Sequence, residues 1–267
     1  MRISLSAAWD ETKAILARDG RLLVAVALAM LVLPGLILDL SMPTATPGKM
    51  PPAGPWMAIA AVAIAISLAG QLAIIRLALG AGTSVGDAIV HGFRRLLPYL
   101  AALLLWIVPL VLIAGALYAA AGVESETPKG APAFGFMVIV GIGLFLAFRL
   151  LLSSSVASAE TEGPIGILKR GWALGRGNWW LLFVFSMLFA VMLFVVLGAI
   201  SAVLGSVVAA ASGGIERWSL GSLLVSLISQ VISSTISVVF FVMIARMYRQ
   251  AAGAGSDAQV SVPRTGD

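Results

Sequence analysis

The chain has 267 residues, of which 60% are hydrophobic and only 11% are charged. An ordinary soluble domain carries about 25% charged residues, so this composition excludes a chain whose whole surface faces water and predicts a membrane protein. The net charge is +5 and cysteine is absent, which excludes disulfides and thiolate chemistry. Nucleic-acid binding would need a basic patch with stacking aromatic residues, and no such pattern occurs in the sequence.

The N-terminal residues 4–18 have the pattern of an amphipathic helix, with apolar side chains recurring on one face. Trp9 and the flanking basic residues favour a helix that lies in the lipid headgroup region. The alternative is a solvated helix that packs on the rest of the protein. The first membrane span follows at about residues 22–40, and we expect a kink at Pro34-Gly35, since proline removes one backbone donor.

Five further apolar stretches are long enough to cross a hydrocarbon core of about 30 Å. They lie at about residues 56–79, 97–121, 133–158, 179–203 and 220–247. The sequence therefore predicts an all-α integral membrane protein with six transmembrane helices. We assign residues 1–250 to a single six-span membrane domain. Residues 251–267 are small and polar, and we predict a disordered cytoplasmic tail there.

Short charged segments with helical patterns precede the first, third and fifth spans. The second of these segments begins at Ser84, which has the spacing of a capping box with Asp87. The third follows Gly163-Pro164, because proline suits the first position of a helix. Its apolar residues lie on more than one face, so we expect it to be partly buried against neighbouring spans. This order predicts three units, each an interfacial helix followed by a helical hairpin.

The basic residues are distributed unequally between the two ends of the spans. Only Lys49, Lys129 and Arg217 lie on one side. Twelve lie on the other side: Arg2, Lys13, Arg18, Arg21, Arg94, Arg95, Lys169, Arg170, Arg176, Arg246, Arg249 and Arg264. Because loops rich in lysine and arginine stay in the cytoplasm, we predict that the second side and both chain termini are cytoplasmic.

Arg149 lies inside the fourth span, about 9 Å from its end at 1.5 Å per residue. A charge at that depth costs about 2.5–3.5 kcal/mol unless it reaches lipid phosphates or finds a partner. One interpretation is that the side chain extends to the phosphates of the inner leaflet. The other is an ion pair with Glu160 or Glu162, which would brace the following stretch against the fourth span.

The sixth span carries a stripe of hydroxyl side chains with Gln230 beside it, and Gln71 in the second span is a candidate partner for that stripe. The stripe consists of Ser222, Ser226, Ser229, Ser233 and Ser237. Small and hydroxylated residues allow transmembrane helices to approach closely, so helix packing is one interpretation. A polar translocation path is the other.

Residues for catalysis are scarce in this sequence. His91 is the single histidine, and no HExxH, GxSxG or phosphate-binding loop pattern occurs. The only acidic residue within a span is Asp39, close to the outer boundary, where water can hydrate it. We therefore expect no enzymatic activity, no metal and no cofactor.

The stretch from Glu160 to Trp180 has a recognisable pattern. Its defining residues are Glu160, Gly163-Pro164, Leu168-Lys169-Arg170, Trp172-Ala173-Leu174 and Arg176-Gly177-Asn178-Trp179-Trp180. This pattern resembles that of bacterial membrane proteins of the glycerophosphoryl diester phosphodiesterase membrane-domain type. Gly171 stands where serine is usual in that family, and Gly175 where threonine is usual. The resemblance implies a stand-alone six-span domain in the bacterial inner (plasma) membrane, without the soluble phosphodiesterase domain and without its activity.

From these observations we expect a non-catalytic protein that organises lipid headgroups, or an unidentified partner protein, at the cytoplasmic face. Basic side chains beside tryptophans suit anionic headgroups, at about 1 kcal/mol per base. The candidate contacts are Arg94, Arg95, Lys169, Arg170 and Arg176. The alternative is a carrier that moves a lipid-like or amphipathic solute through the bundle. A polar cavity lined by Ser226, Ser229, Gln230 and Gln71 would favour the carrier.

Overall fold

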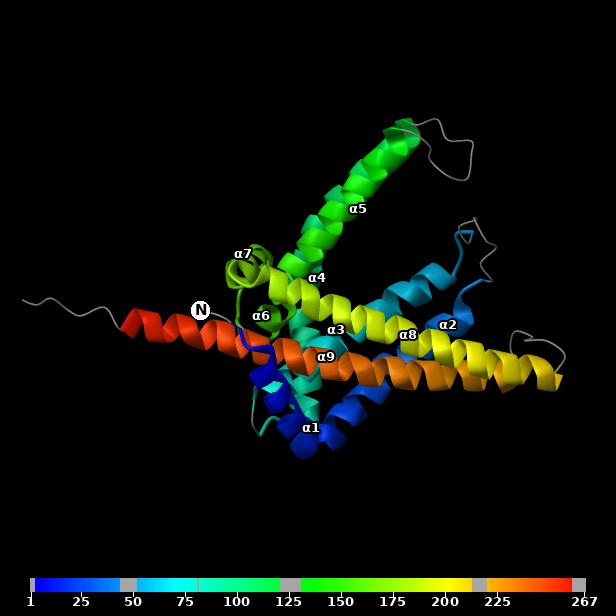
Figure 1. Ribbon diagram of the computed structural model, residues 1–267, viewed down its shortest axis with the longest axis horizontal. Helices are drawn as coiled ribbons and strands as arrows, with labels where there is room; N and C mark the ends of the chain where they lie inside the picture. The colour runs from blue at the N-terminus through cyan, green and yellow to red at the C-terminus, as the bar shows by residue number, and fades with distance from the viewer. Residues whose placement is uncertain (1–2, 44–51, 81, 121–130, 213–219, 261–267) are drawn as a thin grey trace, which may run out of the picture.

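The computed structural model describes residues 3–43, 52–80, 82–120, 131–212 and 220–260, and these residues are helical with no strand among them (Figure 1). Six helices in this part of the chain are long and apolar enough to cross a membrane. The chain is thus an all-α protein of multi-pass membrane type, as the composition predicts.

Ten helical segments follow one another along the chain. They are α1 (Leu5–Ala27), the π-helical turn η1 (Leu28–Val32), α2 (Leu33–Ser41), α3 (Trp56–Leu79), α4 (Val85–Ala120), α5 (Ala131–Arg149), α6 (Ser153–Ala159), α7 (Pro164–Gly175), α8 (Trp179–Ser212) and α9 (Leu220–Val260) within the described residues. The six predicted spans correspond to α1–α2, α3, α4, α5–α6, α8 and α9.

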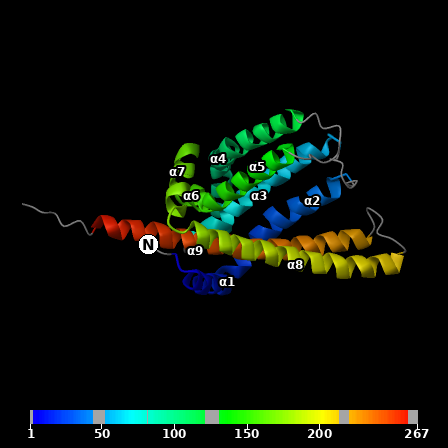
Figure 2. The same cartoon turned by 45° about the horizontal axis from the view of Figure 1, so that its top comes forward.

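The long helices form three hairpins, α2 with α3, α4 with α5, and α8 with α9. The hairpins meet at the end of the molecule where α6 and α7 lie, and they spread apart toward their loops (Figures 1 and 2). We call the meeting point the convergent end. On the spread arms, apolar side chains such as Leu112 and Phe194 stay 67% and 80% exposed, as expected for surfaces that face lipid rather than water.

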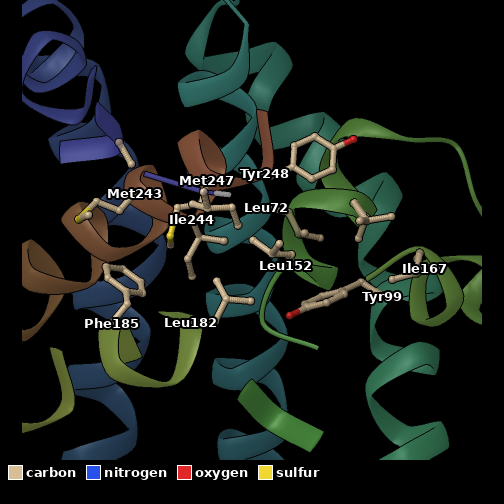
Figure 3. Packing of buried hydrophobic residues seen from close by; sticks show 14 of the residues in the cluster. Leu72, Tyr99, Leu152, Ile167, Leu182, Phe185, Met243, Ile244, Met247 and Tyr248 are labelled. Carbon is tan, nitrogen blue, oxygen red and sulfur yellow. The ribbon is translucent and has the colours of Figure 1, made fainter. Parts of the chain in front are cut away.

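The buried apolar core lies at the convergent end. Figure 3 shows Leu72, Leu152, Leu182 and Ile244, from α3, the turn before α6, α8 and α9, gathered around one centre. All four side chains are at most 1% exposed. Packing in a membrane protein depends on close contact rather than on exclusion of water, so this core is where the three hairpins hold one another.

The predicted interfacial helix 4–18 and the first span form one continuous helical run from Leu5 to Ser41. Ser4 caps its start, where its side chain accepts from the Ala7 N–H. The irregularity lies at η1, just before Pro34, and there the Leu33 N–H donates to the Leu28 carbonyl five residues back. A widened turn at this point makes room for the proline ring, which would otherwise crowd the carbonyl four residues earlier.

The second short helix is likewise continuous with its span. Ser84 starts α4 as predicted, because its Oγ accepts from the Asp87 N–H at 3.1 Å. The helix then runs to Ala120, with Pro98 and Pro109 inside it. Of the three predicted short helices only α7 stands apart within the described residues. The division into three equivalent units therefore stays a prediction.

Two other boundaries differ from the prediction. The fourth span is interrupted at residues 150–152, directly after Arg149, and resumes as α6. At the C-terminus α9 continues to Val260, whereas the sequence predicts a disordered tail from residue 251. Ala251, Ala252 and Ala254 have strong helix propensity, which favours this extension of the helix. Residues 261–267 of the predicted tail lie outside the described residues.

Candidate functional site

The stretch from Glu160 to Trp180 lies at the convergent end, where α7 (Pro164–Gly175) contacts α4, α5, α6 and α9. It contains α7, which starts at Pro164 after Gly163, as the sequence predicts. The helix is partly buried, as expected, with Ile167, Gly171 and Gly175 facing the protein. The contacts of this stretch define the candidate site, because basic and aromatic side chains from four helices meet there.

Arg95 of α4 holds the segment that leads into α7. Its Nε donates to the Ala157 carbonyl at 2.8 Å, and its Nη2 donates to the Glu160 and Glu162 carbonyls at 2.5 and 2.9 Å. The neighbouring His91 Nε2 lies 2.8 Å from the Ser158 carbonyl. The Ala157, Ser158 and Glu160 carbonyls lie at the C-terminus of α6, where helix geometry leaves acceptors unsatisfied. The Glu162 carbonyl belongs to the segment between α6 and α7.

Two other arginines make the same kind of contact. Arg246 of α9 donates to the Ala78 carbonyl near the C-terminus of α3 at 2.5 Å, and it lies 3.6 Å from the Glu11 carboxylate. Arg149 donates to the carbonyl of Gly175, the last residue of α7, at 3.1 Å. Each arginine thus joins its own helix to the C-terminus of another helix, which stabilises the convergent end.

Arg149 therefore does brace the central stretch, but through different partners from those predicted. Its guanidinium lies 4.5 Å above the Trp172 ring centre, as well as bonding to Gly175. None of the ion pairs found among the described residues joins Arg149 to Glu160 or Glu162. The hydrogen bond and the aromatic face compensate a buried charge without a carboxylate.

Glu160 connects α7 to α9. Its Oε1 accepts from the Tyr248 hydroxyl at 2.7 Å and lies 3.2 Å from the Arg170 Nε. Tyr248 is 7% exposed, so its hydroxyl depends on this one carboxylate for a partner within the described protein. The contact ties the end of the sixth span to the segment that precedes α7.

Replacing Tyr248 with phenylalanine is expected to lower the free energy of unfolding by about 1.5–3 kcal/mol, because a hydrogen bond to a charged group is lost. SDS-induced unfolding in mixed micelles measures this change. Tyr118 is 52% exposed on α4, and Tyr118→Phe is the matched control with no expected effect. Equal stability of the two variants would show that the Glu160–Tyr248 contact contributes nothing.

Two of the three glycines of α7, Gly171 and Gly175, lie too close to neighbouring helices to carry a larger side chain without a shift. A Cβ at Gly175 would lie 2.6 Å from the Arg149 carbonyl oxygen, and one at Gly171 would lie 3.2 Å from the Ser153 Cβ. Serine and threonine are usual at these positions in the family that the sequence resembles. In this protein α7 packs too closely on α5 and α6 to accept those side chains without a shift.

Of the five predicted headgroup contacts, two have partners within the protein and three have none among the described residues. Arg95 is engaged by three backbone carbonyls, so it is a structural residue rather than a free headgroup contact. Arg170 is half-exposed and paired with Glu160. Arg94, Lys169 and Arg176 are exposed, and no ion pair or hydrogen bond holds their side chains within the described part of the chain. Trp172, Trp179 and Trp180 lie on the same stretch, at 40%, 40% and 62% exposure.

The residues predicted to line a polar path have different neighbours in the described structure. Gln230 packs against Gly35 of α2, and Ser226 donates to the Asp39 carboxylate. Gln71 instead lies with Ser153 and Ser154 around the Tyr99 hydroxyl. Ser226 and Gln230 of α9 thus contact α2, whereas the contact found for Gln71 is with Tyr99 of α4.

A mainly apolar groove with a volume of about 560 Å³ lies between the start of α1 and helices α8 and α9. Its lining includes Trp9, Phe185, Phe189, Val239 and Met243, and the polar side-chain groups among the lining residues are the hydroxyls of Ser6 and Thr235 and the indole N–H of Trp9. Ligand sites have volumes of about 300–1,000 Å³. An apolar lining suits an acyl chain better than a polar solute.

Sequence reasoning missed several residues of this site. His91, Tyr99 and Arg246 bond or pack across helices, and none of them was a predicted contact. For Arg246 a signal exists, because each second span ends with an arginine near its inner end. No group of three histidine, cysteine, aspartate or glutamate residues that could hold a metal ion lies in the described ranges.

Six apolar helices with a basic, tryptophan-rich convergent end define an all-helical, multi-pass membrane protein. Within that class, the chain belongs to the family described as a domain of unknown function, DUF7847, whose model matches residues 3–251. Neither the curated proteins nor the solved structures contain a match to the chain. The resemblance to the glycerophosphoryl diester phosphodiesterase membrane domain stays a prediction.

Proposed function

We propose that this protein is a non-catalytic integral membrane protein that organises anionic lipid headgroups at its convergent end. We place that end at the cytoplasmic face of a bacterial inner membrane, on the strength of the unequal distribution of lysine and arginine. The observation that carries the proposal is that some basic side chains bond to the protein itself, whereas others are exposed and have no partner among the described residues. Arg95, Arg149 and Arg246 bind the protein itself, whereas Arg94, Lys169 and Arg176 are exposed. Lys169 and Arg176 lie on the same stretch as the exposed Trp172, Trp179 and Trp180.

Free basic side chains at the level of interfacial tryptophans suit phosphate groups of anionic lipids. Each base near such a surface contributes about 1 kcal/mol to the attraction. Tryptophan favours the same depth, because its ring is apolar and its N–H needs a polar partner. The rigid packing of α7 on α5 and α6 would hold these side chains at one height in the membrane.

Removing the charges of α7 tests this function. The double variant Lys169→Gln, Arg176→Gln is expected to reduce the preference for phosphatidylglycerol over phosphatidylcholine by about tenfold or more, at about 1 kcal/mol per base. Relative lipid binding is measured in bilayers by quenching of tryptophan fluorescence with brominated lipids. The control is Lys13→Gln, whose charge is already paired with Asp10 at 2.8 Å. If wild-type protein binds both lipids equally, the proposed function is wrong.

A further inference from the structure

The apolar groove between the start of α1 and the α8–α9 hairpin has a rigid floor. The Phe185 ring, which lines the groove, stacks on Phe240 of α9 with 5.2 Å between the ring centres. Phe189, also in the lining, lies 4.9 Å from the Phe185 ring and 5.3 Å from the Phe240 ring. Figure 3 shows Phe185 beside Met243, another lining residue, at one side of the buried core. The three rings hold α8 against α9, so the groove is preformed.

The start of α1 forms the third wall of the groove and is anchored to both neighbouring helices. The Ser4 N–H donates to Oε1 of Gln250 on α9 at 2.9 Å. The Ile3 N–H donates to Oδ1 of Asn178, which directly precedes α8, at 3.3 Å. The residues that α1 contributes to the lining are Leu5, Ser6 and Trp9. Because this wall is fixed at its first residues, its side chains keep their places along the groove.

The polar groups of this wall favour a ligand with an acceptor or an anion at one end. The Trp9 indole N–H has no hydrogen bond to the described protein, and the side chain is 44% exposed. The first turn of α1 is the positive end of the helix and carries no acidic residue. Asp10, farther along, is paired with Lys13 at 2.8 Å. The Thr235 hydroxyl on the opposite wall is already satisfied, because it donates to a carbonyl of its own helix at 2.8 Å.

We propose that this groove binds one acyl chain of a membrane glycerophospholipid, whose phosphate and ester oxygens meet the start of α1. Apolar cavities do not hold stable water, so apolar matter must fill this volume in a membrane. A membrane helix from another chain would bring no free acceptors, because its carbonyls bond within the helix. A glycerophospholipid offers an apolar chain together with oxygens that accept, and a phosphate suits a helix N-terminus. This inference goes beyond the proposed function, because it requires neither the charges of α7 nor a preference for anionic lipids.

Photo-cross-linking tests the site, with purified full-length protein in detergent and phosphatidylcholine that carries a diazirine in one acyl chain. We expect cross-links on residues 185–192 and 235–243 about fivefold more often than on the exposed apolar residues 104–117 of α4, because a preformed groove contacts a chain on several sides. Phosphatidylglycerol with the same chain should label the groove equally. Diacylglycerol with the same chain should label it about two- to fivefold less, because it has no phosphate for the positive end of α1.

Two substitutions fill the groove from different helices. Leu188 lines the groove and is 66% exposed on α8, so Leu188→Trp adds a ring there without entering the core. We expect it to reduce the groove cross-links about fivefold, because the ring takes the place of the chain. Val239→Phe should do the same from α9. Leu112→Trp is the matched control, since Leu112 is 67% exposed on α4, and it should change neither the groove cross-links nor SDS-induced unfolding relative to Leu188→Trp.

The remaining outcomes would overturn the site. Even labelling of all lipid-facing helices, or groove cross-links that survive both filling substitutions, would show that no chain is bound there. Equal labelling by diacylglycerol and phosphatidylcholine would overturn the assignment to a phospholipid. Because the protein has no cysteine, oxidation of membranes that contain Leu188→Cys reports a second copy of the chain in the groove. A disulfide-linked dimer that Leu112→Cys does not form would therefore replace the lipid by that copy.

Failure of this site and failure of the proposed function have different signatures. The double variant Lys169→Gln, Arg176→Gln should keep the groove cross-links of wild type. Wild-type protein that keeps these cross-links but shows no preference for phosphatidylglycerol would contradict the proposed function and support the acyl-chain site. Wild-type protein that prefers phosphatidylglycerol but labels evenly along its helices would overturn the acyl-chain site alone.

Discussion

Replacing Arg95 with glutamine is expected to lower the free energy of unfolding by about 2–4 kcal/mol. The guanidinium donates to the carbonyls of Ala157, Glu160 and Glu162, which follow one another along the chain into α7. Each hydrogen bond to a charged group contributes about 1.5–3 kcal/mol, and bonds from a single group are not additive. Glutamine is too short and too narrow to serve three acceptors, so the C-terminus of α6 would lose its main anchor.

The neighbouring residue provides a matched control. Arg94→Gln removes the same charge one position earlier on α4, but Arg94 is exposed and makes no hydrogen bond to the described protein. Its effect on SDS-induced unfolding should stay within about 0.5 kcal/mol. Arg95→Lys tests geometry at constant charge, since a lysine ammonium lacks the planar fork, and we expect an intermediate loss. Equal stability of Arg95→Gln and Arg94→Gln would show that the carbonyl contacts do not hold α6 in place.

Replacing Gly92 with alanine is expected to cost about 1–3 kcal/mol, although alanine is the better helix former. The added methyl group would overlap the Ala69 carbonyl oxygen and lie 3.2 Å from the Ala69 carbonyl carbon. Both atoms belong to the backbone of α3, so no side-chain rotation can relieve the overlap. The two helices must move apart, and the contacts of His91 and Arg95 with the segment after Leu152 weaken as a consequence.

Gly115 of the same helix is the control for this substitution. No heavy atom lies within 4 Å of a Cβ built there, so Gly115→Ala should leave stability unchanged or raise it by up to about 1 kcal/mol. Thermal unfolding in detergent compares the two variants directly. If Gly92→Ala is as stable as Gly115→Ala, the close crossing of α3 and α4 is not required for stability.

Much of the architecture could be predicted from the apolar stretches. A single segment that crosses lipid must pair its own backbone N–H and C=O groups, and an α-helix does so. The continuity of the helices could not be predicted from the sequence. The polar residues 85–96 and the apolar residues after them form one helix, although Pro98 lies where the two parts meet. A change from polar to apolar composition marks the depth in the membrane, and it does not mark the end of a helix. The same reasoning applies to the N-terminal run, in which Gly20 alone does not interrupt α1.

The candidate site illustrates a second limit of sequence reasoning. The ion-pair prediction for Arg149 considered Glu160 and Glu162, because carboxylates are the partners that a sequence displays. The partner found is the Gly175 carbonyl, a group that every residue carries, and the aromatic face of Trp172. Nothing in the sequence distinguishes one backbone carbonyl from another, so only the fold shows which of them is left unsatisfied at a helix end.

The sequence by itself determined that this is a helical membrane protein and that its basic residues gather at one end of the spans, because hydropathy and charge are properties of single residues. Only the tertiary structure decided which of those basic side chains bond to carbonyl groups of the protein and which have no partner among the described residues. Arg95, Arg149 and Arg246 meet helix C-termini that lie far away along the chain, whereas Arg76 and Arg94 have no such acceptor in the described structure. The physical reason is that the partner of a buried arginine is set by the distance between helices, which depends on small side chains at a few crossings such as Gly92 and Gly175.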